Sequence, residues 1–67
     1  MSTPKQRVEL ELTDLNSRLV GLNHFLDSAR NRDKVGSTQA TLMYLQADKM
    51  KDYAHTLKRR LEEWDNG

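Results

Sequence analysis

The 67-residue sequence contains no cysteine, only one proline and three glycines, and no long apolar run. The absence of cysteine excludes disulfide bonds and thiolate metal sites. The longest uninterrupted apolar stretch, Leu42 to Leu45, is far too short to span a membrane as a helix. The N-terminal residues Met-Ser-Thr-Pro lack the apolar core of a signal peptide. We therefore expect a cytoplasmic protein with no membrane partner.

An excess of charge of one sign is also lacking. Eleven Lys and Arg residues are balanced by ten Asp and Glu residues, which leaves a formal net charge of +1. Dedicated nucleic-acid-binding domains carry a strong basic excess, so we expect no sequence-specific nucleic-acid partner. No Ser or Thr has a His and an acidic residue at triad-like spacing, and no glycine-rich phosphate loop is present. We therefore expect a protein without enzyme activity and without a cofactor.

The two histidines, His24 and His55, offer no metal site within one chain. Their positions place them at different heights on two separate helices, because each residue of a helix advances the axis by a fixed rise. Both also fall on outer helix faces. We expect solvated surface histidines, with a metal site between two chains as the less favoured alternative.

Apolar and small residues in the second half of the chain recur at alternating steps of three and four. This spacing places them along one seam of a helix that we expect from about residue 38 to residue 64. Small residues occupy one edge of the seam, which favours close approach of a second helix. The seam consists of Ala40, Met43, Ala47, Met50, Ala54, Leu57, Leu61 and Trp64.

The first half of the chain predicts a matching helix from about residue 4 to residue 30. Thr3 suits the N-cap, Pro4 the first helical position, and Gln6 the return contact of a capping box. Gly21 lies inside this helix, where it costs roughly 1 kcal/mol relative to Ala. Either another backbone approaches closely there or the helix tolerates one weak residue. The second seam consists of Val8, Leu12, Leu15, Leu19, Leu22, Leu26 and Ala29.

The polar stretch from about residue 31 to residue 37 carries no apolar period and predicts the turn. Ser37 or Thr38 is expected to cap the second helix. A short connection between two helices of similar length favours antiparallel neighbours. We therefore predict an all-α fold, a single domain over residues 1–67, built as an antiparallel two-helix hairpin.

Several apolar residues lie outside both seams and need a second covering surface. Such residues are expected of a helix that is covered on more than one side. We predict a homo-oligomer, most simply two hairpins that form a four-helix bundle; a marginal monomer is the alternative. Leu10 and Val20 also lie off the seams, and the candidate interface residues are Phe25, Leu42, Tyr44, Leu45 and Tyr53.

The open end of the hairpin gathers basic residues, because antiparallel packing brings the start of the first helix close to the end of the second. Arginine suits phosphate, and an aromatic ring can stack on a base. Alternatively, Lys58 and Arg59 pair with Glu62 and Glu63 one turn later. Trp64 continues the seam and is expected in the core rather than as a ligand platform. The candidate ligand-binding residues are Arg7, Tyr53, Lys58, Arg59 and Arg60.

The residue pattern as a whole resembles a family of very short bacteriophage proteins, named after a member from a crAss-like phage. The resemblance covers nearly all of both helices, and the family forms helical hairpins that mostly lack an assigned activity. It rests on Arg7, Val8, Glu11, Leu15, Arg18, Leu19, Leu22, Phe25, Leu26, Ser28, Gln39, Leu42, Met43, Gln46, Met50, Tyr53, Leu57 and Arg60.

This resemblance implies a phage or prophage protein, and small phage proteins of this kind commonly act against host systems. One hypothesis is that an oligomer of hairpins sequesters a phosphate-bearing signalling nucleotide. The alternative is an interaction protein whose apolar surface around Leu42, Tyr44 and Leu45 docks on a host protein and inhibits it. Sensitivity to salt separates the two, since phosphate capture weakens as ionic strength rises.

Overall fold

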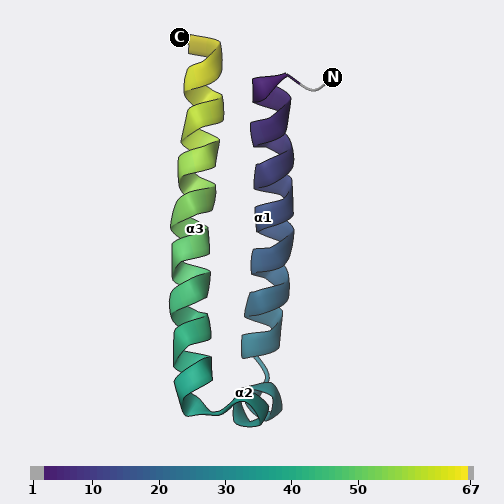
Figure 1. Ribbon diagram of the computed structural model, residues 1–67, viewed down its shortest axis with the longest axis vertical. Helices are drawn as coiled ribbons and strands as arrows, with labels where there is room; N and C mark the ends of the chain where they lie inside the picture. The colour runs from purple at the N-terminus through teal and green to yellow at the C-terminus, as the bar shows by residue number, and fades with distance from the viewer. Residues whose placement is uncertain (1–2, 67) are drawn as a thin grey trace.

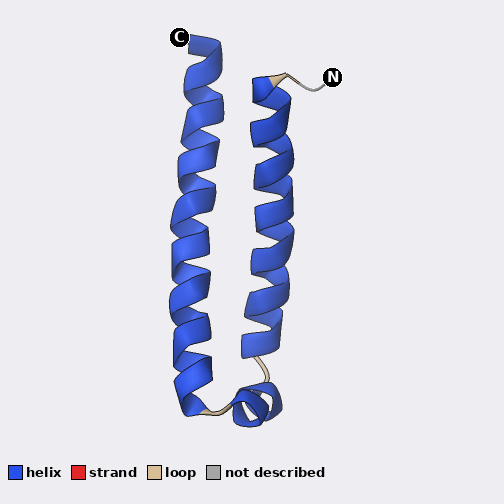
Figure 2. Cartoon of the chain, in the orientation of Figure 1, coloured by secondary structure: helices blue, strands red, loops and turns tan. Residues whose placement is uncertain are grey.

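The chain folds into three helices, and residues 3–66, which the computed structural model describes, contain no strand (Figures 1 and 2). Helix α1 spans Pro4–Leu26, α2 spans Ala29–Val35, and α3 spans Ser37–Asn66. The predicted all-α fold is confirmed, whereas the predicted number of two helices is wrong. Of the domain expected over residues 1–67, Met1, Ser2 and Gly67 lie outside the described residues.

Helix α1 begins as the sequence predicts. The Thr3 hydroxyl accepts a hydrogen bond from the Gln6 backbone N–H at 3.2 Å. The Thr3 backbone N–H donates in return to Gln6 Oε1 at 2.9 Å. This capping box satisfies two backbone donors that have no partner inside the helix, and Pro4 follows at a position where no N–H is needed. The start of α1 is therefore fixed by local chemistry.

The connection between the long helices differs from the predicted turn. Helix α1 ends at Leu26 instead of about residue 30, and residues 29–35 form a separate short helix where a non-helical turn was expected. Ser28 caps this helix, since its hydroxyl accepts a hydrogen bond from the Asn31 backbone N–H at 3.4 Å. Gly36 ends it with φ of 88° and ψ of 160°, a conformation almost restricted to glycine. Ser37 is then the first residue of α3 rather than its cap.

Three side chains cover the carboxyl end of α1, where backbone carbonyls lack partners within the helix. Asn31 Nδ2 donates a hydrogen bond to the carbonyl oxygen of Phe25 at 3.3 Å. Arg32 Nη1 and the Tyr44 hydroxyl both donate to the carbonyl oxygen of Leu26, the hydroxyl at 3.3 Å. The Arg32 guanidinium also lies 3.5 Å from the Tyr44 oxygen. These bonds tie α2 and α3 to the end of α1.

Helices α1 and α3 lie side by side, with the start of α1 and the end of α3 at the same end of the molecule and α2 at the other (Figure 1). The molecule measures 46 × 21 × 14 Å, so it is two helices wide and one helix thick. Its core is centred on Val8, Leu15 and the fully buried Leu57. Half-buried residues of both helices pack against them, namely Leu12, Met50, Ala54 and Leu61.

The predicted seams are buried or half-buried at every position except the last one of each seam. Ala40 and Ala47 are buried, as a close helix contact requires. Ala29 is exposed because it belongs to α2, and Trp64 is 39% exposed, so the expectation of a core tryptophan is wrong. A Cβ added at Gly21 meets no atom within 4 Å, so no backbone of this chain approaches that glycine.

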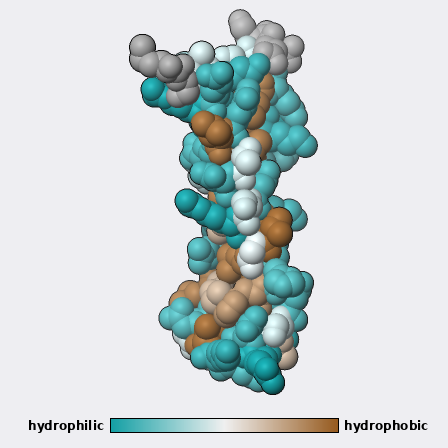
Figure 3. Space-filling model, turned by 90° about the vertical axis from the view of Figure 1, so that its right-hand side faces the viewer, coloured by the Kyte–Doolittle hydropathy of each residue, from teal (hydrophilic) through white to brown (hydrophobic). Residues whose placement is uncertain are grey.

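Most of the apolar residues outside the seams remain exposed in the folded chain, whereas Phe25 is half-buried. Val20 is 69% exposed and Leu10 is 63% exposed, both on α1. On the α1 side of the molecule, brown apolar patches are scattered among hydrophilic surface (Figure 3). On α3, Leu42, Tyr44, Leu45 and Tyr53 are exposed to between 46% and 54%. The observation behind the predicted homo-oligomer therefore holds, and the oligomer itself stays a prediction.

Candidate functional site

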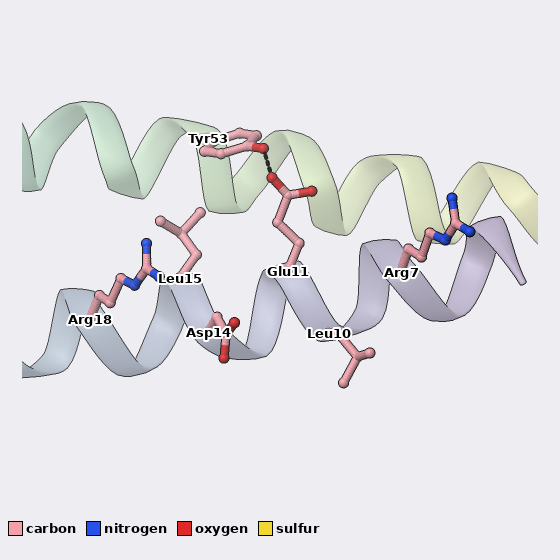
Figure 4. Close-up of a pocket in the computed structure, with 7 residues that line it drawn as sticks. All are labelled: Arg7, Leu10, Glu11, Asp14, Leu15, Arg18 and Tyr53. Carbon is pink, nitrogen blue, oxygen red and sulfur yellow. Dashed lines mark hydrogen bonds between the residues drawn. The ribbon is translucent and has the colours of Figure 1, made fainter. Parts of the chain in front are cut away.

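A hollow of about 360 Å³ lies on one face of the helix pair, between α1 and α3 (Figure 4). Its volume is at the lower end of the range of small-molecule sites, about 300–1,000 Å³. Six of its lining residues come from α1 and one from α3. They are Arg7, Leu10, Glu11, Asp14, Leu15, Arg18 and Tyr53.

The charged residues of the hollow share one side of α1 because of their spacing. Arg7, Glu11, Asp14 and Arg18 follow one another at steps of four, three and four residues, which is the period of a helix face. Their charges run positive, negative, negative, positive along the helix. In Figure 4 the two arginines extend toward α3 on either side of Glu11. The hollow therefore offers guanidinium groups at its ends and carboxylates at its centre.

Tyr53 joins the two helices across this hollow. Its hydroxyl donates a hydrogen bond to Glu11 Oε1, and the two residues are 42 positions apart in the sequence (Figure 4). The tyrosine ring forms the α3 side of the hollow, while Leu15 lies below it in the core. The hydrogen bond fixes the carboxylate of Glu11 in the space between the helices. An aromatic face and fixed acceptor oxygens thus lie beside the arginines.

The structure brings together only part of the predicted ligand-binding set. Arg7 and Tyr53 line the same hollow although they come from different helices. Lys58, Arg59 and Arg60 are exposed on α3 and do not line it. Arg60 follows Tyr53 by seven residues and so lies on the same side of α3, about two turns further along. Lys58 and Arg59 are rotated from Tyr53 by about 140° and 120°, because each residue turns a helix by about 100°.

Three charged residues of the hollow were not predicted as ligand-binding residues. From the sequence, Glu11 is expected to favour the positive end of the helix dipole, and Asp14 is expected to pair with Arg18 one turn later on the helix surface. The signal that could have identified them is the spacing of residues 7, 11, 14 and 18 on a helix whose seam was already known. That signal was weak because charged residues at such spacing also occur on ordinary solvated helix faces.

The candidate oligomer interface divides into two groups in the structure. Leu42 and Leu45 are exposed on α3. Phe25 is half-buried, Tyr44 donates its hydroxyl to the carboxyl end of α1, and Tyr53 lines the hollow. These three residues therefore already have contacts within the chain. In an oligomer they would keep these contacts and gain others from the second chain.

Among the described residues, no group of three or more His, Cys, Asp and Glu side chains could hold a metal ion. His24 and His55 are both exposed. No helix over residues 3–66 has the length and apolar character needed to cross a membrane.

Comparison with known proteins places the chain in a family. No curated protein and no solved structure matches it. The model of one protein family, Sequestin, matches residues 2–63, which include all of α1 and α2, the hollow, and most of α3. Because the match covers nearly the whole sequence, the chain belongs to the Sequestin family.

Proposed function

We propose that this chain is a non-enzymatic phage protein that counters host defence by sequestering a phosphate-bearing signalling nucleotide in the host cytoplasm. In this proposal the hollow between α1 and α3 holds the nucleotide, and no bond is made or broken. Membership of the Sequestin family is compatible with such a role, since the family name denotes sequestration. The phage origin rests on the resemblance described above.

The observation that carries the proposal is the meeting of Arg7, Arg18 and Tyr53 in one hollow. A guanidinium group presents a planar fork of N–H donors that matches a phosphate, and each charge-assisted contact is stronger than a neutral hydrogen bond. The tyrosine ring offers a surface on which a base can stack. These are the two kinds of contact that a nucleotide needs, and they come from different helices of the fold.

A second copy of the chain completes the site in this proposal. The hollow is a depression on a molecule that is one helix thick, so it covers one side of a ligand. Small-molecule sites commonly bury more than about 70% of the ligand surface. A facing chain would cover the other side and would also bury exposed apolar residues such as Leu42 and Leu45. Binding and assembly are therefore expected to be coupled.

Calorimetry against a panel of cyclic di- and trinucleotides and related immune signals tests this function. At low salt we expect at least one ligand to bind and to be recovered chemically unchanged after the protein is heat-denatured. Arg18→Ala should weaken binding by about 1.5–3 kcal/mol, the usual contribution of a hydrogen bond to a charged group. Arg60→Ala should have a smaller effect, because Arg60 does not line the hollow.

Arg30→Ala is the matched control for these variants. Arg30 is an exposed arginine on α2, at the end of the molecule opposite the start of α1. Arg32 is unsuitable as a control because it holds the carboxyl end of α1. Failure of every nucleotide in the panel at low salt would refute the proposal. A dominant effect of Arg30→Ala would show that the ligand binds near α2 and not in this hollow.

Exposure of Leu42 and Leu45, at 51% and 54%, favours a second candidate function. In this alternative the apolar surface of α3 docks on a host protein and inhibits it. Apolar docking should change little with ionic strength, whereas phosphate capture should weaken strongly. Leu42→Lys with Leu45→Lys would abolish docking on a host protein, and it would also weaken nucleotide binding, because a facing chain that completes the site is expected to bury the same two residues. The dependence on salt therefore separates the two functions.

A further inference from the structure

We infer that Glu11 is the selectivity residue of the hollow: its carboxylate lies between two arginines and rejects ligands that offer negative charge alone. The hollow then accepts an anion that also carries hydrogen-bond donors, such as hydroxyl or amino groups, beside its phosphate. This inference rests on the proposed function, because it specifies which anionic ligands the same hollow admits. Free polyphosphates and the sugar-phosphate backbone of DNA belong to the rejected class, because they offer negative charge with few or no donors.

The charges that line the hollow cancel one another. Two arginines and two carboxylates contribute, and the carboxylates occupy the central positions of the stripe. Arg7 and Arg18 are separated by about 16 Å along the axis of α1, since each residue advances the helix by about 1.5 Å. A compact anion that contacts either guanidinium therefore also lies close to Glu11 or Asp14. A simple anion trap would not place two carboxylates there.

The hydrogen bond from Tyr53 determines how Glu11 acts. An ionised carboxylate only accepts hydrogen bonds and has room for several donors. The Tyr53 hydroxyl supplies one donor from α3 and holds the carboxylate in the space between the helices, where a ligand would enter (Figure 4). Its remaining lone pairs favour a ligand donor and repel a phosphate oxygen. Glu11 thus adds a requirement for donors to the requirement for phosphate set by the arginines.

The discriminating experiment replaces the charge of Glu11 and keeps its shape. Glu11→Gln retains Oε1 as an acceptor for the Tyr53 hydroxyl and removes the negative charge. Inorganic pyrophosphate is the probe because it is a compact polyanion that, apart from an acidic P–O–H at neutral pH, lacks the hydroxyl and amino donors of a nucleotide. Calorimetry at low ionic strength should show that pyrophosphate binds about tenfold tighter to Glu11→Gln than to the natural protein. This is the size of effect expected when one repulsive charge is removed from a site that is partly exposed to water.

Glu9→Gln provides the matched control. Glu9 is another exposed glutamate of α1, two residues away, and it does not line the hollow. The substitution changes the net charge of the protein by the same amount, so it reports the general electrostatic effect. Pyrophosphate affinity should change less than about twofold in this variant, because exposed charges outside the site are screened by solvent. Asp14→Asn, a substitution inside the hollow, should increase the affinity for pyrophosphate, as Glu11→Gln does.

The outcomes separate this inference from the proposed function. A gain in pyrophosphate affinity at Glu11 and Asp14 that exceeds the gain at Glu9 supports the selectivity role. Equal gains at Glu9 and Glu11, or no gain at either hollow residue in variants with unchanged circular dichroism, overturn it. If the natural protein binds a nucleotide of the panel and these gains are absent, only the selectivity role fails. If no nucleotide binds but the gains appear, only the proposed function fails.

Discussion

Replacing Gly21 by alanine should stabilise the protein. The glycine lies inside α1 and its φ is not positive, since the one glycine with positive φ among the described residues is Gly36. A Cβ built at this position meets no atom within 4 Å. Alanine therefore fits without strain, and the entropy that the unfolded chain loses on folding becomes smaller. The expected gain in the free energy of unfolding is about 0.5–1 kcal/mol.

Thermal and urea denaturation followed by circular dichroism measures this gain. For a domain of this size, a gain of 1 kcal/mol raises the melting temperature by about 4–8 °C. The measurement should be made over a wide range of protein concentrations, because association of folded chains adds stability by mass action. At the lowest concentrations, where association contributes least, Gly21→Ala should be more stable than the natural protein.

The concentration dependence also tests why a glycine is present. Loss of stability in Gly21→Ala at every concentration would refute this prediction, because it would mean that a Cβ at position 21 collides with other atoms of the same chain. Loss only at high concentration would show that the backbone of a second chain comes close to Gly21. The oligomer interface would then include that side of α1, which carries scattered exposed apolar residues such as Leu10.

The remaining predictions concern the turn, the helix contact and the assembly. Gly36→Ala should destabilise the protein by about 1–3 kcal/mol in urea denaturation, because φ of 88° with ψ of 160° is strained for any residue with a Cβ; a neutral result would show that the turn relaxes. Ala47→Leu should cost about 1–3 kcal/mol by overpacking the contact between α1 and α3, whereas an unchanged urea midpoint would place the buried alanine edge away from that contact. Leu57→Ala should cost about 2–5 kcal/mol in the same assay, since Leu57 is fully buried at the centre of the core, and a cost below 1 kcal/mol would contradict that position. Sedimentation at micromolar concentration should give a mass at least twice the 7.8 kDa of one chain, and a stable monomer would contradict the predicted homo-oligomer.

Much of the fold could be predicted because the two seams carry a repeated signal. Seven or eight apolar and small positions per helix agree on one face, and errors at single positions do not change the period. The ends of the seams could not be predicted in this way, since Ala29 and Trp64 continue the spacing but lie beyond the region where the helices cover each other. Periodicity identifies a face of a helix and does not say how far its neighbour extends.

The short helix α2 was missed for a different reason. With 7 residues it completes about two turns, which is too short for an apolar period to appear, and none of its residues is buried. Its formation depends on the cap at Ser28 and on contacts from Arg32 and Tyr44 to the end of α1. The first of these signals is local and could have been recognised, whereas the contact of Tyr44 joins residues 18 positions apart and requires the folded structure.

The candidate site could be predicted only in part. Sequence reasoning selected basic residues by their closeness along α3, and therefore included Lys58 and Arg59. A site depends instead on side chains that share a face, and rotation about the helix axis separates these two from Tyr53. Arg18 could not be distinguished from a surface arginine until α3 placed an aromatic ring beside it. The pairing of α1 with α3 is thus the information that the sequence pattern lacked.

A core that is one row of side chains deep also limits how the length of such a protein can change. An insertion into α1 alone would move its seam past the seam of α3 and pair each large residue with the wrong neighbour. Matched insertions of seven residues in both helices preserve the register, so length should vary among related chains in steps of about fourteen residues. A pair of insertions between the hollow and α2 would leave Arg7, Arg18 and Tyr53 in the same hollow. The distance from the site to the turn is therefore free to evolve while the site is retained.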